Sequence, residues 1–145
     1  MALDNCWSLY EIMGVSLLDM QVWKWLYEHP ENTASELKQA VLKMSVEIWN
    51  KYYAPVFGVK DQTLLAIYSH MISYPLYLSN YAYGHLIDFQ IEEHIRGKVF
   101  GSEIERIFKQ GRLTPREWMI GAVNNDISIE PMLNATKEAL KKLAN

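Results

Sequence analysis

The chain has 145 residues, of which 50% are hydrophobic and 21% are charged. A chain of this length can bury roughly 68–70% of the surface that its unfolded form exposes, so we expect one domain over residues 1–145. The 14 Lys and Arg against 17 Asp and Glu give a formal net charge of -3. No basic run is long enough to follow a phosphate backbone, and nucleic acid is therefore excluded as an expected partner.

Cysteine content and hydropathy exclude two further classes of protein. Cys6 is the only cysteine, so neither an intrachain disulfide nor a cysteine-rich zinc site is predicted. The apolar residues 7–27 are interrupted by charges such as Glu11 and Asp19, and no membrane span is predicted there. Asp4 lies where a signal peptide would carry basic residues. Whether the protein is cytoplasmic or exported stays open.

Signals for helix ends recur along the chain without any run of alternating β-branched residues, which predicts an all-α fold, a multi-helix globular bundle. Residues 4–28 are expected to form one or two helices, broken near Gly14 and ended before Pro30. Thr33 and Glu36 form a T-x-x-E capping box, in which each side chain satisfies the other's free backbone N–H. A helix is predicted from this box to about residue 53.

The middle of the chain is predicted to hold two more helices. Asp61 is a plausible N-cap for a helix that reaches Ile72. Pro75 suits the first turn of the next helix, which we expect to be long and to end near Gly97.

Three shorter helices are predicted in the last third of the chain. Thr114-Pro115-Arg116-Glu117 supplies a capping box together with a proline at the first helical position. Gly111 is expected to close the helix before it, and Ser128 to cap the helix after it. The three helices are predicted over residues 102–110, 114–123 and 130–143.

The segment over residues 69–93 is unusually rich in tyrosine and histidine. If a helix follows Pro75, some of its polar side chains stack along one face at spacings of four, four, three and four residues. A hydrogen-bond ladder inside a bundle and a polar line facing a cleft are both open interpretations. A metal site on His85, Asp88 and Glu92 is a weaker alternative, because neither H-E-x-x-H nor E-x-x-H occurs in the sequence. The polar stripe consists of Tyr77, Tyr81, His85, Asp88 and Glu92.

One motif in this segment resembles a known family. His70, Tyr77 and the Tyr81-Ala82-x-Gly84 pattern are similar to the sequence that follows the zinc site in peptidases of the thimet oligopeptidase and oligoendopeptidase F family. The spacing between the histidine and the first tyrosine is one residue longer here. The segment over residues 111–118 is similar to the C-terminal region of angiotensin-converting enzyme and bacterial carboxypeptidase relatives. The resemblance covers roughly residues 62–143.

The resemblance implies a C-terminal subdomain of a zincin-like helical peptidase, and it implies roles for particular residues. Tyr81 would donate a hydrogen bond to the oxyanion of the tetrahedral intermediate, and Tyr77 would be a supporting donor. His70 would bind or stabilise the substrate. Tyr74 and His85 are further candidates for substrate binding. A phenol is a neutral, rigid donor, suited to a position where negative charge develops.

The zinc of that family would be held by an H-E-x-x-H helix and a downstream Glu, none of which can be placed here. The chain alone is therefore expected to bind no zinc beyond what a surface histidine binds, and to be inactive. Our leading hypothesis is the substrate-channel part of a zinc metallopeptidase that hydrolyses peptides. The alternative is a noncatalytic helical module that binds peptides. A homodimer through exposed apolar surface is a further expectation.

Overall fold

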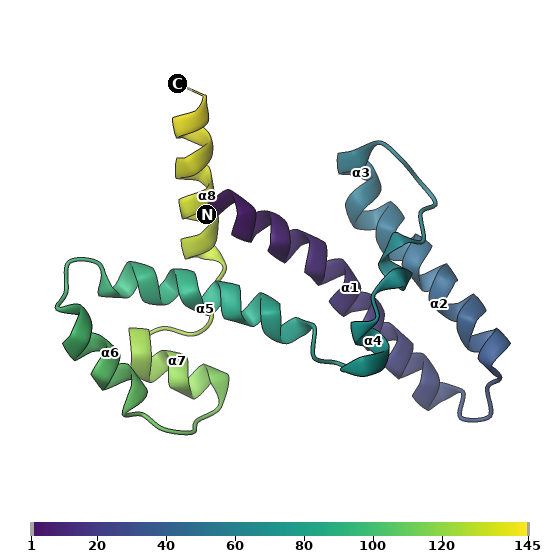
Figure 1. Cartoon of the computed structure of the whole chain (residues 1–145), viewed down its shortest axis with the longest axis horizontal. Coiled ribbons are helices and arrows are strands. Elements are labelled where there is room, and N and C mark those ends of the chain that lie inside the picture. The colour runs from purple at the N-terminus through teal and green to yellow at the C-terminus, as the bar shows by residue number, and fades with distance from the viewer. Residues whose placement is uncertain (1, 145) are drawn as a thin grey trace. The chain divides into compact units, whose positions relative to one another are not determined.

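The computed structural model describes residues 2–144, which form helices and no β-strand (Figure 1). The predicted all-α fold is therefore confirmed. The helices divide into two compact units, one over Leu9–Tyr81 and the other made of the residues up to Ser8 together with those from Ala82 onward. The prediction of one domain over the whole chain stays a prediction. None of the helices in residues 2–144 is long and apolar enough to cross a membrane.

The first helix, α1 (Ala2–Glu28), runs through Gly14 without a break. Of the one or two helices expected here, the structure has one, and the break expected near Gly14 is wrong. The backbone N–H of Gly14 donates a 2.9 Å hydrogen bond to the hydroxyl of Tyr53. A Cβ atom on Gly14 would lie 2.1 Å from that hydroxyl oxygen. The glycine is therefore needed for the close approach of a side chain, and it does not end the helix.

The predicted capping box is confirmed at the start of α2 (Ala34–Ile48). The hydroxyl of Thr33 accepts from the N–H of Glu36 at 3.3 Å, and the Glu36 carboxylate accepts from the N–H of Thr33 at 2.8 Å. The helical path extends beyond the predicted residue 53 through a π-helical turn, η1 (Trp49–Tyr53), and α3 (Ala54–Phe57). Gly58 ends it with a φ of 72°, a conformation that costs glycine little.

The core of the Leu9–Tyr81 unit joins α1 to the helices that follow it. The indole N–H of Trp49 donates to the carbonyl of Val59 at 2.7 Å, so the loop after α3 is tied to the same core. Leu78 is buried here with 1% of its surface exposed, and it fixes the chain just before α5. The core residues are Val15, Leu18, Ile48, Trp49, Tyr53, Ala54, Leu65 and Leu78.

The segment between Gly58 and α5 differs from the prediction. Asp61 has a φ of 60° and pairs with Asn50 through two hydrogen bonds of 2.8 Å, so it does not cap a helix. Only a short 3-10 turn, η2 (Leu64–Ile67), and one turn of α-helix, α4 (His70–Ser73), follow. Pro75 lies before the long helix α5 (Ser79–Ile95) and not in its first turn.

The second unit contains α5 from Ala82 onward, followed by α6 (Phe100–Phe108), α7 (Pro115–Val123) and α8 (Glu130–Leu143). The Thr114 capping box and the proline at the first position of α7 are confirmed. Ile129 occupies the N-cap of α8, while the hydroxyl of Ser128 accepts from the N–H of Glu130 at 3.2 Å. The buried apolar side chains of this unit are Ala82, Phe89, Ile107, Met119, Ala122 and Met132.

Candidate functional site

Four aromatic side chains at the end of the Leu9–Tyr81 unit form a closed cycle of ring contacts, which we call the aromatic cluster. The ring centroids of His70 and Tyr74 lie 6.0 Å apart, those of Tyr74 and Tyr77 6.3 Å, and those of Tyr77 and Tyr81 5.6 Å. The contact between His70 and Tyr81, at 6.5 Å, closes the cycle. Tyr81 meets both of its neighbours edge to face, at 83° and 85°, the arrangement that ring quadrupoles favour.

Short local elements place these four rings together. His70 begins α4, and the N–H of Tyr74 donates to the carbonyl of His70 at 2.8 Å. Pro75 disfavours helical geometry at Tyr74, whose φ of -141° ends α4. The N–H of Tyr77 then donates back to the carbonyl of Tyr74 at 3.2 Å. Tyr81 lies in the first turn of α5, so a tight turn folds two tyrosines against one histidine and a third tyrosine.

The aromatic cluster is open to solvent. Tyr74, Tyr77 and Tyr81 are 61%, 49% and 42% exposed, and the His70 side chain is half-buried. Within residues 2–144, no hydrogen bond engages the three hydroxyl groups or the imidazole. The cluster therefore presents three phenol groups and one imidazole that are available to an incoming ligand.

A buried carboxylate holds the turn that carries the aromatic cluster. The backbone N–H of Leu76 donates a 2.7 Å hydrogen bond to Oδ2 of Asp19 on α1, and Asp19 is only 1% exposed. Leu76 has a φ of 60°, in the left-handed region that costs a non-glycine residue roughly 1–2 kcal/mol. The hydrogen bond to Asp19 and the burial of Leu78 hold this strained backbone in place.

Asp19 is an unusual buried group. Its second oxygen, Oδ1, is buried and has no hydrogen-bond partner in the described part of the chain. Burial raises the pKa of the Asp19 carboxyl, and the hydrogen bond from Leu76 opposes that change. Sequence reasoning missed this residue, because an Asp is ordinarily interpreted as a surface residue. Its place among Leu17, Leu18 and Met20 is the one sequence signal that could have marked it.

The residues assigned by the resemblance are only partly brought together. His70, Tyr74, Tyr77 and Tyr81 share the aromatic cluster, but the helical spacing from Tyr77 to Tyr81 is not the reason, because Tyr77 precedes α5. The stripe along one helix face is therefore wrong at its first member. His85 is half-buried on α5 in the other unit.

The metal alternative at the end of the stripe gains no geometric support. Glu92 pairs with Arg96 at 3.6 Å along α5, and Asp88 is exposed. No group of three or more His, Cys, Asp or Glu side chains in residues 2–144 is arranged to hold a metal ion. The zinc that the resemblance implies would be held by residues outside this sequence, so no chemical step of this chain is assigned to a metal.

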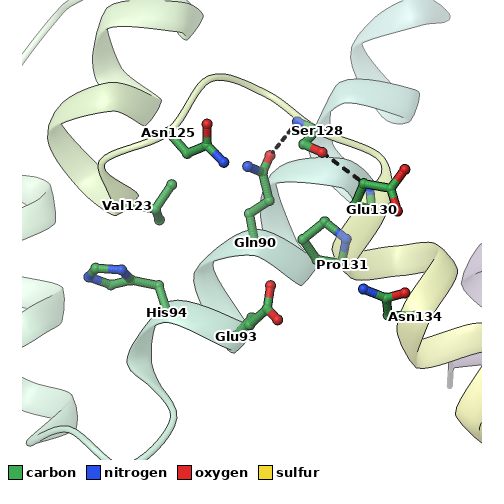
Figure 2. Close-up of a pocket in the computed structure, with 9 residues that line it drawn as sticks. All are labelled: Gln90, Glu93, His94, Val123, Asn125, Ser128, Glu130, Pro131 and Asn134. Atoms are coloured by element: carbon green, nitrogen blue, oxygen red, sulfur yellow. Dashed lines mark hydrogen bonds between the residues drawn. The ribbon is translucent and has the colours of Figure 1, made fainter.

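The second unit contains a polar pocket of about 330 Å³ beside Gln90 (Figure 2). Gln90 is 4% exposed, and its amide accepts from the N–H of Ser128 at 2.8 Å and donates to the carbonyl of Asp126 at 2.9 Å. These bonds tie the loop between α7 and α8 to α5. Gln90 was not singled out from the sequence, and its role is to satisfy loop backbone. The pocket is lined by Gln90, Glu93, His94, Val123, Asn125, Ser128, Glu130, Pro131 and Asn134.

His94 at the edge of this pocket belongs to an ion-pair network. Its Nε2 lies 3.1 Å from a carboxylate oxygen of Glu103, which also accepts from Arg106 at 2.9 Å. The Arg106 guanidinium, with the nearby His94 and Lys98, lowers the pKa of Glu103. Arg106 in turn donates to the carbonyl of Gly121 at 2.8 Å. The network joins α5, α6 and α7, so His94 has a structural role.

No protein-family model, curated protein or solved structure matches this chain. Membership of the peptidase family therefore stays a prediction.

Proposed function

We propose that this chain supplies a peptide-binding surface of a zinc-dependent peptidase, with the aromatic cluster in contact with the peptide. The observation that carries the proposal is the ring contact between His70 and Tyr81 at 6.5 Å. These residues are eleven positions apart in the sequence. The resemblance implies that Tyr81 donates to the oxyanion and that His70 binds or stabilises the substrate. Tyr77 contacts the ring of Tyr81 at 5.6 Å, and both tyrosines are exposed.

The chemistry of the aromatic cluster suits a peptide backbone. A peptide bond offers a carbonyl acceptor and an N–H donor, and phenol and neutral imidazole groups can act as either partner. The Tyr81 hydroxyl can donate to a carbonyl oxygen as negative charge develops there. Such a donor accelerates acyl-transfer chemistry when its bond is stronger in the transition state than in the ground state.

The proposal assigns no zinc ligand to this chain. The ligands that the resemblance implies would lie in a longer polypeptide that contains this sequence. In that setting, the contribution of residues 70–81 is binding, orientation and hydrogen-bond donation to the substrate.

A second candidate function is a noncatalytic helical module that binds peptides. It is favoured by the location of the aromatic cluster, which is complete within the Leu9–Tyr81 unit. Such a surface requires no metal in order to bind a peptide.

The experiment is a titration of the chain with a blocked, uncharged peptide, acetyl-tetra-alanine amide, followed by NMR of the tyrosine and histidine ring protons. Both candidates predict shifts at His70 and Tyr81, and a weaker affinity for Tyr81→Phe than for the control Tyr83→Phe. Absence of any binding contradicts both. An H-E-x-x-H motif in the same reading frame would then favour the peptidase, and a complete reading frame without it would favour the binding module.

A further inference from the structure

We infer that the aromatic cluster binds an organic cation, namely the ammonium or guanidinium group of a peptide side chain. The inference deepens the proposed function and rests on it, because a peptide is the ligand that carries the cation. It assigns a preferred class of peptide, which the resemblance to a peptidase does not provide.

The aromatic cluster is a closed cycle of four ring contacts. Neighbouring ring centroids lie 5.6 to 6.5 Å apart, while no ring contact joins His70 to Tyr77 or Tyr74 to Tyr81. Because neighbouring centroids lie this close together, a cation on the exposed surface of the cluster can lie within about 6 Å of two of them, the range over which a ring face attracts a cation. Quaternary and alkylated ammonium ions are recognised by sets of aromatic rings of this kind.

The cluster does not receive a cation from its own chain. The cation–π contact found within residues 2–144 is that of Lys51 over Tyr52, at 4.9 Å, and it lies elsewhere in the unit. Residues 62–87 contain no Lys, Arg, Asp or Glu. A ligand cation therefore meets neither a competing cation nor a neutralising carboxylate in this segment.

Charge complementarity comes from two sources. The face of a phenol ring is the negative part of its quadrupole, and the side chains of Tyr74, Tyr77 and Tyr81 are exposed. Behind the turn, the Asp19 carboxylate accepts from the N–H of Leu76, between Tyr74 and Tyr77 in the chain. When Asp19 is ionised, its negative charge favours a cation on the outer side of the turn.

The first test uses a pair of small probes of the same shape, choline and its neutral isostere 3,3-dimethyl-1-butanol, at about pH 8, where an ordinary histidine is neutral. We expect choline to shift the ring resonances of the aromatic cluster and to bind about tenfold more tightly than the alcohol, the size of a good cation–π contact. Equal affinities for the two probes would overturn the inference.

Two variants of Tyr77 separate the ring from its hydroxyl. Tyr77→Leu removes the ring and should weaken choline binding about tenfold, whereas Tyr77→Phe keeps the ring face and should retain most of the affinity. The matched control is Tyr83→Leu, whose tyrosine is 51% exposed against 49% for Tyr77 and, within residues 2–144, makes no ring contact with the cluster, and it should leave choline binding unchanged. Circular dichroism establishes that each variant is folded. Unchanged choline binding in folded Tyr77→Leu would also overturn the inference.

A pair of peptides identifies the source of the cation. Acetyl-Ala-Arg-Ala-Ala-amide should bind more tightly than its glutamine analogue, which has the same length and no charge. Equal binding of the two peptides would leave the proposed function standing and overturn the cation preference. A choline preference without binding of either peptide would support the cation site and contradict the proposed function.

Discussion

At the scale of single residues, the proposed role of the Tyr81 hydroxyl as a hydrogen-bond donor to the substrate gives the first prediction. In a longer protein that carries the zinc ligands, Tyr81→Phe keeps the ring contacts and removes only the oxygen. If that oxygen donates more strongly to the transition state than to the ground state, we expect kcat to fall by about 10²–10³-fold. Steady-state kinetics on a short peptide measures it. Tyr83→Phe is the control, and equal small effects from both would contradict the role given to Tyr81.

Asp19 gives a second prediction, on pH dependence. Its pKa is raised in the folded protein, so the folded state binds this proton more tightly than the unfolded state does. The cost of burying the ionised form is complete above the folded pKa, declines as the pH falls through it, and is absent below the unfolded value. In Asp19→Asn, the hydrogen bond from Leu76 can be kept while this titration is lost.

The stability of the wild type relative to Asp19→Asn should therefore increase as the pH is lowered from about 7 to about 4. Urea unfolding at several pH values measures this difference. Asp88→Asn, at an exposed position, is the matched control and should show no such trend. A difference for Asp19→Asn that does not change with pH would contradict the prediction.

At the scale of elements, Tyr53 approaches α1 so closely that a side chain at position 14 should destabilise the fold. In Gly14→Ala, the added Cβ would lie 2.1 Å from the Tyr53 hydroxyl and 2.5 Å from its ring. Overpacking of this kind costs about 1–3 kcal/mol, while alanine gains at most about 1 kcal/mol over glycine in a helix. We expect a net loss in the free energy of unfolding, measured by urea denaturation. Gly84→Ala on α5 meets nothing within 4 Å and should be stabilising.

The elements also show which features can be predicted from sequence. The capping boxes at Thr33 and Thr114 were predicted correctly because their partners lie three residues away. The turn around Leu76 was not, since it depends on Asp19, which is 57 residues distant. The same holds for Asp61, whose partner is Asn50. Local patterns thus predict helix starts, whereas conformations held by distant side chains escape them.

The candidate site could likewise be predicted only in part, namely in its residues and not in its backbone. The resemblance selected His70 and Tyr81, and the structure brings their rings into contact. The periodicity argument expected Tyr77 on the same helix face as Tyr81, and it failed because Pro75 and Leu76 form a turn before α5. Which residues carry polar chemistry could be predicted from the sequence, whereas the backbone that groups them could not.

At the scale of the whole molecule, exposed apolar side chains lead to a prediction about association. Large apolar side chains are exposed in both units, and extended apolar surface promotes contacts between protein copies. We expect a homodimer, with a mass in light scattering of about twice the 16.9 kDa of the chain. A monomer mass at high concentration would contradict this. The most exposed of these side chains are Tyr27, Ile67, Ile72, Val99, Phe108 and Leu143.

The bond between Asp19 and Leu76 has a consequence on the timescale of hydrogen exchange. Leu76 is exposed in a turn, where amide protons ordinarily exchange quickly with deuterium. Its N–H is donated to a carboxylate that solvent scarcely reaches, so this one proton should exchange far more slowly than those of other exposed turns. In Asp19→Ala the protection should vanish, and fast exchange of Leu76 in the wild type would show that the turn opens freely. The rate at this amide therefore measures how often the turn that carries the aromatic cluster opens.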